Sequence, residues 1–473
     1  MIQTVGSKTD NRPNGFTLFA FTWAMACFFH QLSFLDWRWY TVPGLALSAA
    51  VILVLLKPSS WIRFAFLLVI DFAGVALKAP IHPNHIIFSW VVNGTMLAAL
   101  ILAARQESLE KDVSTRWYNL FAPWLRIELC ILYFWAVFHK LNVSYFDVDC
   151  SCASKMHREI SAWMPLLPGA KWAQYCAIYG TLIFEAGIPL LLLGRRTRMA
   201  GVIVGMLFHG LLAMHPHAGL FSFSSTMTAL FTVFMPEATA AAMQPPRLLR
   251  KVFQWGLAAF ALVCFIWILR RLLPDSLALE SHLHQISKLG FLAYFLYLFA
   301  GLFIVVVAVR STEAEVRAPL QNSWRTSPLL IVFPLLLILN GFGPYLGLRT
   351  QTSFSMFSNI QTENGASNHL IVPSGIQITN WQYDLVEIID TNNPHLLEVR
   401  EKNYLLPYLE LRRNRRGCAP DMWVTFRRNG VIFTFDAART ETYQVLPPFN
   451  VLAQRYFYFR PVDRDPLKVS CKH

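Results

Sequence analysis

Long apolar blocks dominate this sequence and constrain its fold more than any other feature. Each block runs for about 17–25 residues, which as a helix is long enough to cross a hydrocarbon layer of roughly 30 Å. Only helices and closed barrels satisfy their backbone hydrogen bonds in lipid, and continuous apolar runs favour helices. Hydrophobic residues make up 55% of the chain and charged residues 15%, so we predict an all-α polytopic membrane helix bundle with about 9–11 spans.

The blocks predict eleven candidate spans. They cover residues 16–34, 39–56, 61–79, 85–104, 118–140, 172–193, 199–214, 218–235, 252–270, 289–309 and 327–346. The first 15 residues are polar, so we expect no cleavable signal sequence and insertion through the first helix.

The net charge of +13 (41 Lys and Arg against 28 Asp and Glu) could indicate nucleic-acid binding. We reject that reading because the basic residues form short clusters between apolar blocks, where membrane orientation explains them. Basic clusters follow each even-numbered span, and Arg270 and Arg271 break the pattern. The pattern predicts a membrane protein with its N-terminus in the cytoplasm and its C-terminal region outside.

The character of the sequence changes near residue 347. We predict a helical membrane domain over 1–346 and an extracytoplasmic β-rich soluble domain over 347–473. Short alternating runs mark the expected strands: 369–372, 385–389, 396–400, 405–412, 422–426, 431–435 and 456–459. Asn429-Gly430 is a type I′ hairpin signal, and Cys418 and Cys471 could form a disulfide in an oxidising space.

Ionisable residues within spans are costly, so each is a candidate site. The predicted topology places one group near the outer surface, namely His30, His82, His85, His139, Lys140, His215 and His217. It places Asp71, Glu185 and His209 deeper. Glu185 and His209 could pair between two helices, as a structural or gating contact, and Asp71 could serve a proton path or an internal hydrogen bond.

Lys140 is the sharpest candidate, because it closes the fifth predicted span. It could be a snorkelling lysine whose ammonium reaches the interface. Alternatively it is a buried amine, since desolvation disfavours the ammonium and leaves a neutral base. His85 could face Lys140 across the bundle, or lie at the interface behind an N-capping Asn84.

A metal site is the competing interpretation of the histidines. His215-Pro-His217 is a chelating fragment that His30 or His139 could complete. No His/Glu pair at i, i+3 or i+4 on one helix gives the usual bundle-metal pattern, so we expect no metal. Two further features stand apart: Cys150-Ser-Cys152 favours bridging to a distant cysteine or a free thiol, and Gly201 with Gly205 forms a GxxxG pattern that more often packs helices within a chain than drives dimerisation.

Several short motifs resemble the HTTM membrane domain, which vitamin K-dependent γ-carboxylase shares with bacterial relatives. They are Asn84-His85, Phe138-His-Lys140-Leu-Asn142, Leu207-Phe208-His209 and Gly219-Leu-Phe221. The resemblance covers about residues 12–310. The tail motifs Ser355–Asn359, Thr362–Gly365 and Asn368–Pro373 are similar to those of a bacterial HTTM subgroup.

The resemblance implies a chemistry. Lys140 matches the carboxylase lysine that deprotonates vitamin K hydroquinone, and His85 matches a histidine that is also needed. Oxygen addition then gives a stronger base, which removes a γ-proton from a glutamate before CO2 adds. The resemblance therefore implies a reduced quinone, O2 and CO2 as co-reactants.

This chain also departs from the carboxylase. Its region beyond the membrane domain is much shorter, and it has no recognisable propeptide-docking region. Quinol chemistry with another acceptor, such as a peptide or protein on the outer face, is as plausible as glutamate carboxylation. The alternative is a non-catalytic membrane transporter or partner-binding protein.

Overall fold

The computed structural model describes residues 15–33, 42–78, 82–105, 113–217, 219–243, 278–312, 327–415, 419–448, 450 and 456–472, without the side chains of 278–289. Within this part, five helices are long and apolar enough to cross a membrane. They are α1 (Gly15–Ser33), α4 (Asn84–Arg105), α5 (Val113–Phe138), α8 (Lys171–Leu193) and the Gly290–Ser311 part of α13 (Ala278–Ser311). The chain is therefore a multi-pass membrane protein, as the apolar blocks predict.

Further helices are shorter or carry more charge. They are α2 (Val42–Leu56), α3 (Trp61–Lys78), α6 (Val143–Phe146), α7 (Cys152–Ser161), α9 (Arg198–Ala213), α10 (Gly219–Phe231), η1 (Thr232–Phe234), α11 (Glu237–Ala242), η3 (Pro328–Ile331) and α14 (Val332–Phe342). Ten of the eleven predicted spans overlap a helix of the structure, and the eleventh, 252–270, lies outside the described residues.

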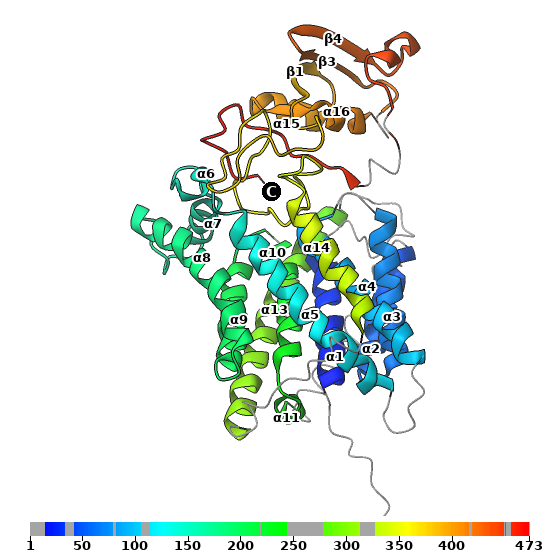
Figure 1. The fold of residues 1–473 in the computed structure, drawn as a ribbon, viewed down its shortest axis with the longest axis vertical. Coiled ribbons are helices and arrows are strands. Elements are labelled where there is room, and N and C mark those ends of the chain that lie inside the picture. The colour runs from blue at the N-terminus through cyan, green and yellow to red at the C-terminus, as the bar shows by residue number, and fades with distance from the viewer. Residues whose placement is uncertain are drawn as a thin grey trace, which may run out of the picture. The chain divides into compact units, whose positions relative to one another are not determined.

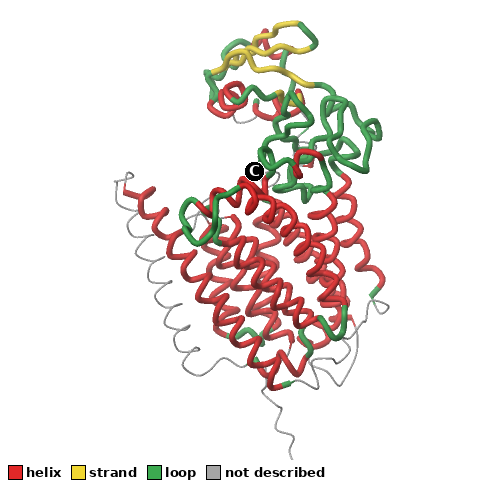
Figure 2. Tube along the Cα trace, turned by 90° about the vertical axis from the view of Figure 1, so that its left-hand side faces the viewer, coloured by secondary structure: helices red, strands yellow, loops and turns green. Residues whose placement is uncertain are grey.

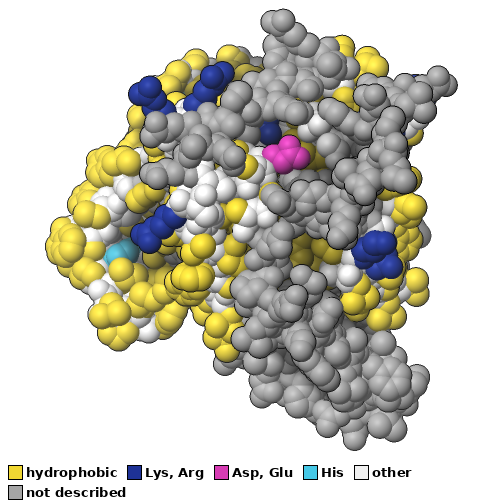
Figure 3. Space-filling model, turned by 90° about the horizontal axis from the view of Figure 1, so that it is seen from below, with side chains coloured by type: hydrophobic (Ala, Val, Ile, Leu, Met, Phe, Trp, Pro, Cys, Tyr) yellow, Lys and Arg dark blue, Asp and Glu magenta, His cyan; other side chains and the backbone are white. Residues whose placement is uncertain are grey.

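Several of these helices present apolar side chains to their surroundings. Only 22% of the apolar stretch of α8 is buried within the protein, and the same holds for Gly290–Ser311. Figure 3 shows hydrophobic side chains over most of the described surface on one face, with Lys and Arg at a few places. Such surfaces are favourable in lipid, where apolar side chains need no protein cover.

The chain divides into two compact units. The first contains Met1–Gly74, Ser89–Leu129 and Gly187–Phe333, and the second contains Val75–Phe88, Cys130–Ala186 and Pro334–His473. The predicted domain boundary at 346 stays a prediction.

Close helix packing builds the first unit. Helix α1 packs against α2, α10 and α13, and α10 packs against α9. Two glycines of α9 permit close approach: a Cβ on Gly205 would lie 2.5 Å from Cζ of Phe231, and a Cβ on Gly201 would lie 2.9 Å from the backbone N of Leu192. The GxxxG pattern thus packs helices within the chain.

A four-stranded antiparallel sheet forms the end of the second unit, in the order β2-β1-β3-β4. Its strands are β1 (Leu385–Thr391), β2 (Leu405–Pro407), β3 (Trp423–Arg428) and β4 (Val431–Asp436). Asn429 and Gly430 join β3 to β4 with φ of 50° and 79°. Positive φ at both central residues confirms the predicted type I′ turn.

Two helices cover one face of this sheet, α15 (Pro394–Glu401) and α16 (Tyr408–Asn414) (Figure 1). Leu396, Val399 and Leu411 from the helices pack with Val386, Ile388, Val424 and Phe426 from the strands. A short 3-10 helix, η4 (Thr440–Gln444), follows β4. The C-terminal region is thus a mixed α and β structure.

Three of the predicted segments do not form strands in the structure. Residues 396–400 lie in α15, because Asn393 caps that helix through the backbone N–H groups of His395 and Leu396 and Pro394 begins it. Residues 369–372 and 456–459 lie in no strand, and 405–412 divides into β2 and α16. Figure 2 shows how much of the C-terminal part is loop.

A disulfide joins Cys152, at the start of α7, to Cys471. The prediction that Cys152 pairs with a distant cysteine is confirmed. The predicted partner of Cys471 was wrong, and Cys418 lies outside the described residues.

Candidate functional site around Lys140

Lys140 lies two residues beyond the end of α5, in a tight turn of the second unit. The backbone N–H of Lys140 donates to the carbonyl of Val137, and the chain then enters α6 at Asn142. The side-chain oxygen of Asn142 accepts from the backbone N–H of Tyr145, 2.9 Å away, and so caps α6. A helix end followed at once by a capped helix fixes the position of the lysine.

The ammonium of Lys140 is buried and paired with Glu185 of α8. Nζ donates to Oε2 at 2.7 Å and Oε1 at 2.9 Å of Glu185, and to the carbonyl of Ala136 at 3.1 Å. The two side chains are 6% and 11% exposed. Lys140 is therefore not a snorkelling lysine.

This pair corrects two expectations. Glu185 bonds to Lys140, so the suggested pairing of Glu185 with His209 is wrong, and Glu185 lies at the level of Lys140 rather than deeper. The hydrogen bonds of Lys140 go to Glu185 and Ala136, and His85 is not among their acceptors. Lys140 is thus paired with a carboxylate and is not an isolated amine.

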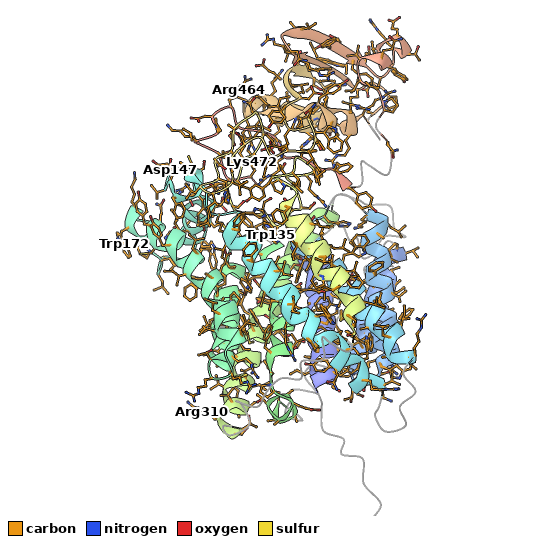
Figure 4. All side chains as sticks on the ribbon, in the orientation of Figure 1. Trp135, Asp147, Trp172, Arg310, Arg464 and Lys472 are labelled. Atoms are coloured by element: carbon orange, nitrogen blue, oxygen red, sulfur yellow. A yellow bond between two sulfur atoms is a disulfide. The ribbon has the colours of Figure 1, made fainter. Side chains whose placement is uncertain are left out.

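The Lys140–Glu185 pair lies close to two tyrosine hydroxyls and to exposed apolar side chains of α8. Tyr133 and Tyr145, both buried, lie within electrostatic range of Glu185. Its neighbours on α8, Ile183 and Phe184, are 69% and 43% exposed. Figure 4 labels Trp135 on α5 and Trp172 on α8, the two helices that lead to the pair. The pair is thus buried, while neighbouring apolar side chains of α8 are exposed.

His139 is fully buried and held from both ring nitrogens. Nδ1 lies 2.9 Å from the hydroxyl of Tyr345, and Nε2 lies 3.1 Å from the carbonyl of Ser353. Because a carbonyl oxygen only accepts, Nε2 carries a hydrogen, while the Tyr345 hydroxyl at Nδ1 can either donate or accept. The ring also stacks on Trp135 at 5.1 Å. Contacts on both ring nitrogens therefore hold His139 in place beside Lys140.

Three asparagines connect this turn to the tail motifs. Asn142 donates to the carbonyls of His139 at 2.8 Å and Ser358 at 2.5 Å. Asn368 donates to Ser144 Oγ at 3.1 Å and to the Asn359 carbonyl at 2.8 Å. Asn359 in turn accepts from the backbone N–H of Cys152 at 2.7 Å. The sequence motifs of the tail thus pack against the Lys140 turn. Short-range sequence patterns could not reveal these long-range contacts.

His369 also connects the tail to the end of α5. Its Nε2 donates to the carbonyl of Phe138 at 2.8 Å, and its Nδ1 accepts from the backbone N–H of Val372 at 3.0 Å. Burial lowers the pKa of His369, although the bond to Phe138 opposes this. A neutral ring is what one donated and one accepted hydrogen bond require.

Asn84 and His85 also meet the tail. The side-chain oxygen of Asn84, the first residue of α4, accepts from the backbone N–H of Phe354 at 2.6 Å. Phe354 has a φ of 63°, and Thr352 and Phe357 also have positive φ. Bulky side chains rarely adopt this conformation, which persists only where surroundings enforce it. His85, the second residue of α4, is buried.

The remaining predicted residues lie in other surroundings. Asp71 accepts from Asn93 at 2.7 Å in the first unit. His209 is buried there among the rings of Phe208, Phe223 and Phe231. Sequence reasoning missed Glu128, a buried carboxyl of α5, because it had no conspicuous neighbour in the sequence.

The histidines considered for a metal site have other contacts. His30 Nδ1 lies 3.0 Å from Ser222 Oγ, and His82 Nε2 donates to the carbonyl of Val75 at 2.8 Å. The backbone N–H of His217 donates to Nδ1 of His215 at 3.0 Å. In the described part of the chain, no group of three or more His, Cys, Asp or Glu residues could hold a metal ion.

The fold and this site define a multi-pass helical membrane protein with a buried lysine–glutamate pair clamped by its C-terminal region. Residues 45–238 match the family model of the HTTM domain, which is the domain in vitamin K-dependent γ-carboxylase. The chain thus matches the HTTM domain over these residues, which confirms the resemblance to that domain. None of the curated proteins or solved structures compared with the chain matches it.

Proposed function

We propose that this chain is an integral membrane enzyme that uses Lys140 and Glu185 as a coupled base on a lipid-soluble quinol. The observation that carries the proposal is the buried contact of Lys140 Nζ with both oxygens of Glu185, beside lipid-facing apolar side chains of α8. An apolar substrate reaches such a site laterally from the bilayer. The reduced quinone supplies an acidic O–H group, and its deprotonation leads, with O2 and CO2, to epoxidation coupled to carboxylation or a related proton abstraction.

The pair can accept a proton in two arrangements. With the shared proton on Nζ, the free acceptor is the Glu185 carboxylate. With the shared proton on Glu185, the Lys140 amine is neutral and accepts at Nζ. A low-dielectric environment brings these two arrangements closer in energy, because it penalises the separated charges. Glu185 therefore provides an acceptor for the lysine proton, which burial alone does not provide.

His85 and His139 act around the pair. We propose that His139 holds the Lys140 turn through Tyr345 and Ser353, and that Asn84 orients the start of α4, with His85 as a hydrogen-bond partner of the substrate. We further propose that the chain lies in a bacterial plasma membrane with its C-terminal region outside, which the Cys152–Cys471 disulfide supports because disulfides persist in oxidising compartments.

Turnover of reduced quinones by the purified full chain in lipid nanodiscs tests the proposal. We expect epoxide from phylloquinol or menaquinol under O2 and bicarbonate, and a loss of about 10²–10⁴-fold in Lys140→Ala, the range that general bases contribute. Lys171→Ala, which removes an exposed lysine of the same unit, is the matched control and should keep full turnover. Equal turnover of Lys140→Ala and wild type, or no product from wild type with either quinol, contradicts the proposal.

One observation favours the alternative, a non-catalytic transporter or partner-binding protein. The Lys140–Glu185 contact is an ion pair formed wholly within the protein, as a purely structural contact would be. In that case Lys140→Ala and His85→Ala retain function if the protein folds, while binding of an outer-face peptide or protein is the activity to assay.

A further inference from the structure

A second buried polar site lies in the first unit, apart from the Lys140 pair. Two carboxyls contact α4 there: Asp71 of α3 accepts from Asn93, and Glu128 of α5 lies 2.5 Å from Oγ1 of Thr95. Asn93, Thr95 and Glu128 have no exposed surface, and Asp71 is also buried. The proposed reaction uses neither carboxyl.

Each contact leaves one buried oxygen atom without a hydrogen-bond donor. Within the described residues, Oε2 of Glu128 and Oδ1 of Asn93 have no hydrogen-bond partner. Each of these atoms is an acceptor. Buried acceptors normally find a donor, and an anionic carboxylate in a membrane helix bundle needs a cation or several donors. Arg126, two residues before Glu128 on α5, donates Nε to the carbonyl of Val233 at 2.8 Å.

The Thr95 hydroxyl lies between two oxygen atoms. Its Oγ1 lies within hydrogen-bond distance of two oxygens, the carbonyl of Val91 at 3.2 Å and Oε1 of Glu128. A hydroxyl has one hydrogen to donate, and the carbonyl has none. If Thr95 donates to Val91, the hydrogen in the shorter contact comes from Glu128. A protonated Glu128 satisfies both contacts at once and leaves no buried charge.

We propose that Glu128 and Thr95 form a proton-binding site within the helix bundle, in which Glu128 holds a proton at neutral pH. Asp71 with Asn93 is a second carboxyl of the same kind on α4. The ligand is a proton, and the site is independent of quinol turnover. A carboxyl that holds a proton inside the bilayer is suited to take up or release it when its surroundings change.

Infrared spectroscopy of the full chain in lipid tests this proposal. A protonated carboxyl gives a carbonyl stretch that is separate from the carboxylate bands and shifts in D2O. We expect Glu128→Gln to remove part of that band at neutral pH. Glu387→Gln, which removes a carboxylate paired with Arg427 and Arg464, is the control and should reduce carboxylate bands only.

Thr95→Val provides the second variant, because it leaves Glu128 in place even if Glu128→Gln fails to fold. Loss of its hydrogen bond should move the protonated band of Glu128 to higher frequency. If Glu128→Gln reduces the carboxylate bands and leaves the protonated band intact, or if Thr95→Val leaves the protonated band unchanged, Glu128 is ionised and the proposal is overturned.

Discussion

Removing one member of the Lys140–Glu185 pair should destabilise the protein more than removing both. A single change leaves a buried charge without its partner, which costs about 3–5 kcal/mol. We expect Lys140→Met and Glu185→Gln each to lower the unfolding midpoint of the purified protein, and the double variant to recover most of the loss. Lys171→Ala should leave the midpoint unchanged. If the single and double variants are equally destabilised, the two side chains are not energetically coupled.

Glu410 gives the C-terminal region a pH dependence of known sign. Burial raises the pKa of this carboxyl to about 7, although the nearby Arg413 opposes the shift. The folded state thus keeps a proton that the unfolded state releases near pH 4.5. Stability therefore falls as pH rises from 4.5 to 7, by about 3 kcal/mol if the whole shift is realised.

Urea unfolding of wild type and Glu410→Gln across this pH range measures the effect. The variant should lose the slope between pH 4.5 and 7, because its side chain does not titrate. Glu398→Gln, which changes an exposed carboxyl of α15, should keep it. A slope that persists in Glu410→Gln assigns the dependence to another group.

Single residues also show what the sequence could not reveal. Lys140 stands out as a charged residue at the end of an apolar run, so it could be found from the sequence alone. Its partner Glu185 is 45 residues away, and no periodicity links the two. The same applies to Tyr345 and Ser353, which hold His139 across 206 and 214 residues.

At the scale of elements, helix α9 depends on two close approaches. Gly205→Ala would place a methyl group against the ring of Phe231, and forcing extra volume into a packed interface typically costs about 1–3 kcal/mol. Gly180→Ala on α8, where a Cβ meets nothing within 4 Å, should be neutral or stabilising because alanine favours helix. Thermal unfolding of both variants checks this contrast, and equal midpoints would show that α9 can shift to admit the methyl group.

The elements differ in how far their sequences specify them. Membrane helices are predictable because an apolar run of sufficient length has few alternatives in lipid. The Asn429-Gly430 hairpin is predictable because its turn type demands positive φ. The prediction of a strand over residues 396–400 was wrong because their apolar spacing resembles that of a strand. Asn393 and Pro394, just before them, mark the start of a helix. The loop from α14 to β1 has no period at all, and its shape depends on long-range asparagine contacts.

At the scale of the whole molecule, the Cys152–Cys471 disulfide ties together residues 319 positions apart. We expect Cys152→Ser or Cys471→Ser to destabilise the protein by about 2–5 kcal/mol, since a long closed loop restricts the unfolded chain. Cys150→Ser should have little effect: burial raises the pKa of the Cys150 thiol to about 11, which keeps it protonated and unreactive towards the disulfide. Unfolding midpoints with and without a reductant check both expectations, and insensitivity of wild type to the reductant would show that the link is dispensable.

The same link sets an order of events during biosynthesis. Asn359 and Asn368, which pack against the Lys140 turn, emerge long after that turn, and Cys471 emerges last of these. At about 5–20 residues per second, the ribosome needs roughly 15–60 s to pass from Cys152 to Cys471. During that interval the Lys140 turn lacks its contacts with Asn359 and Asn368. Chaperones or neighbouring lipid would then have to protect this part of the nascent chain.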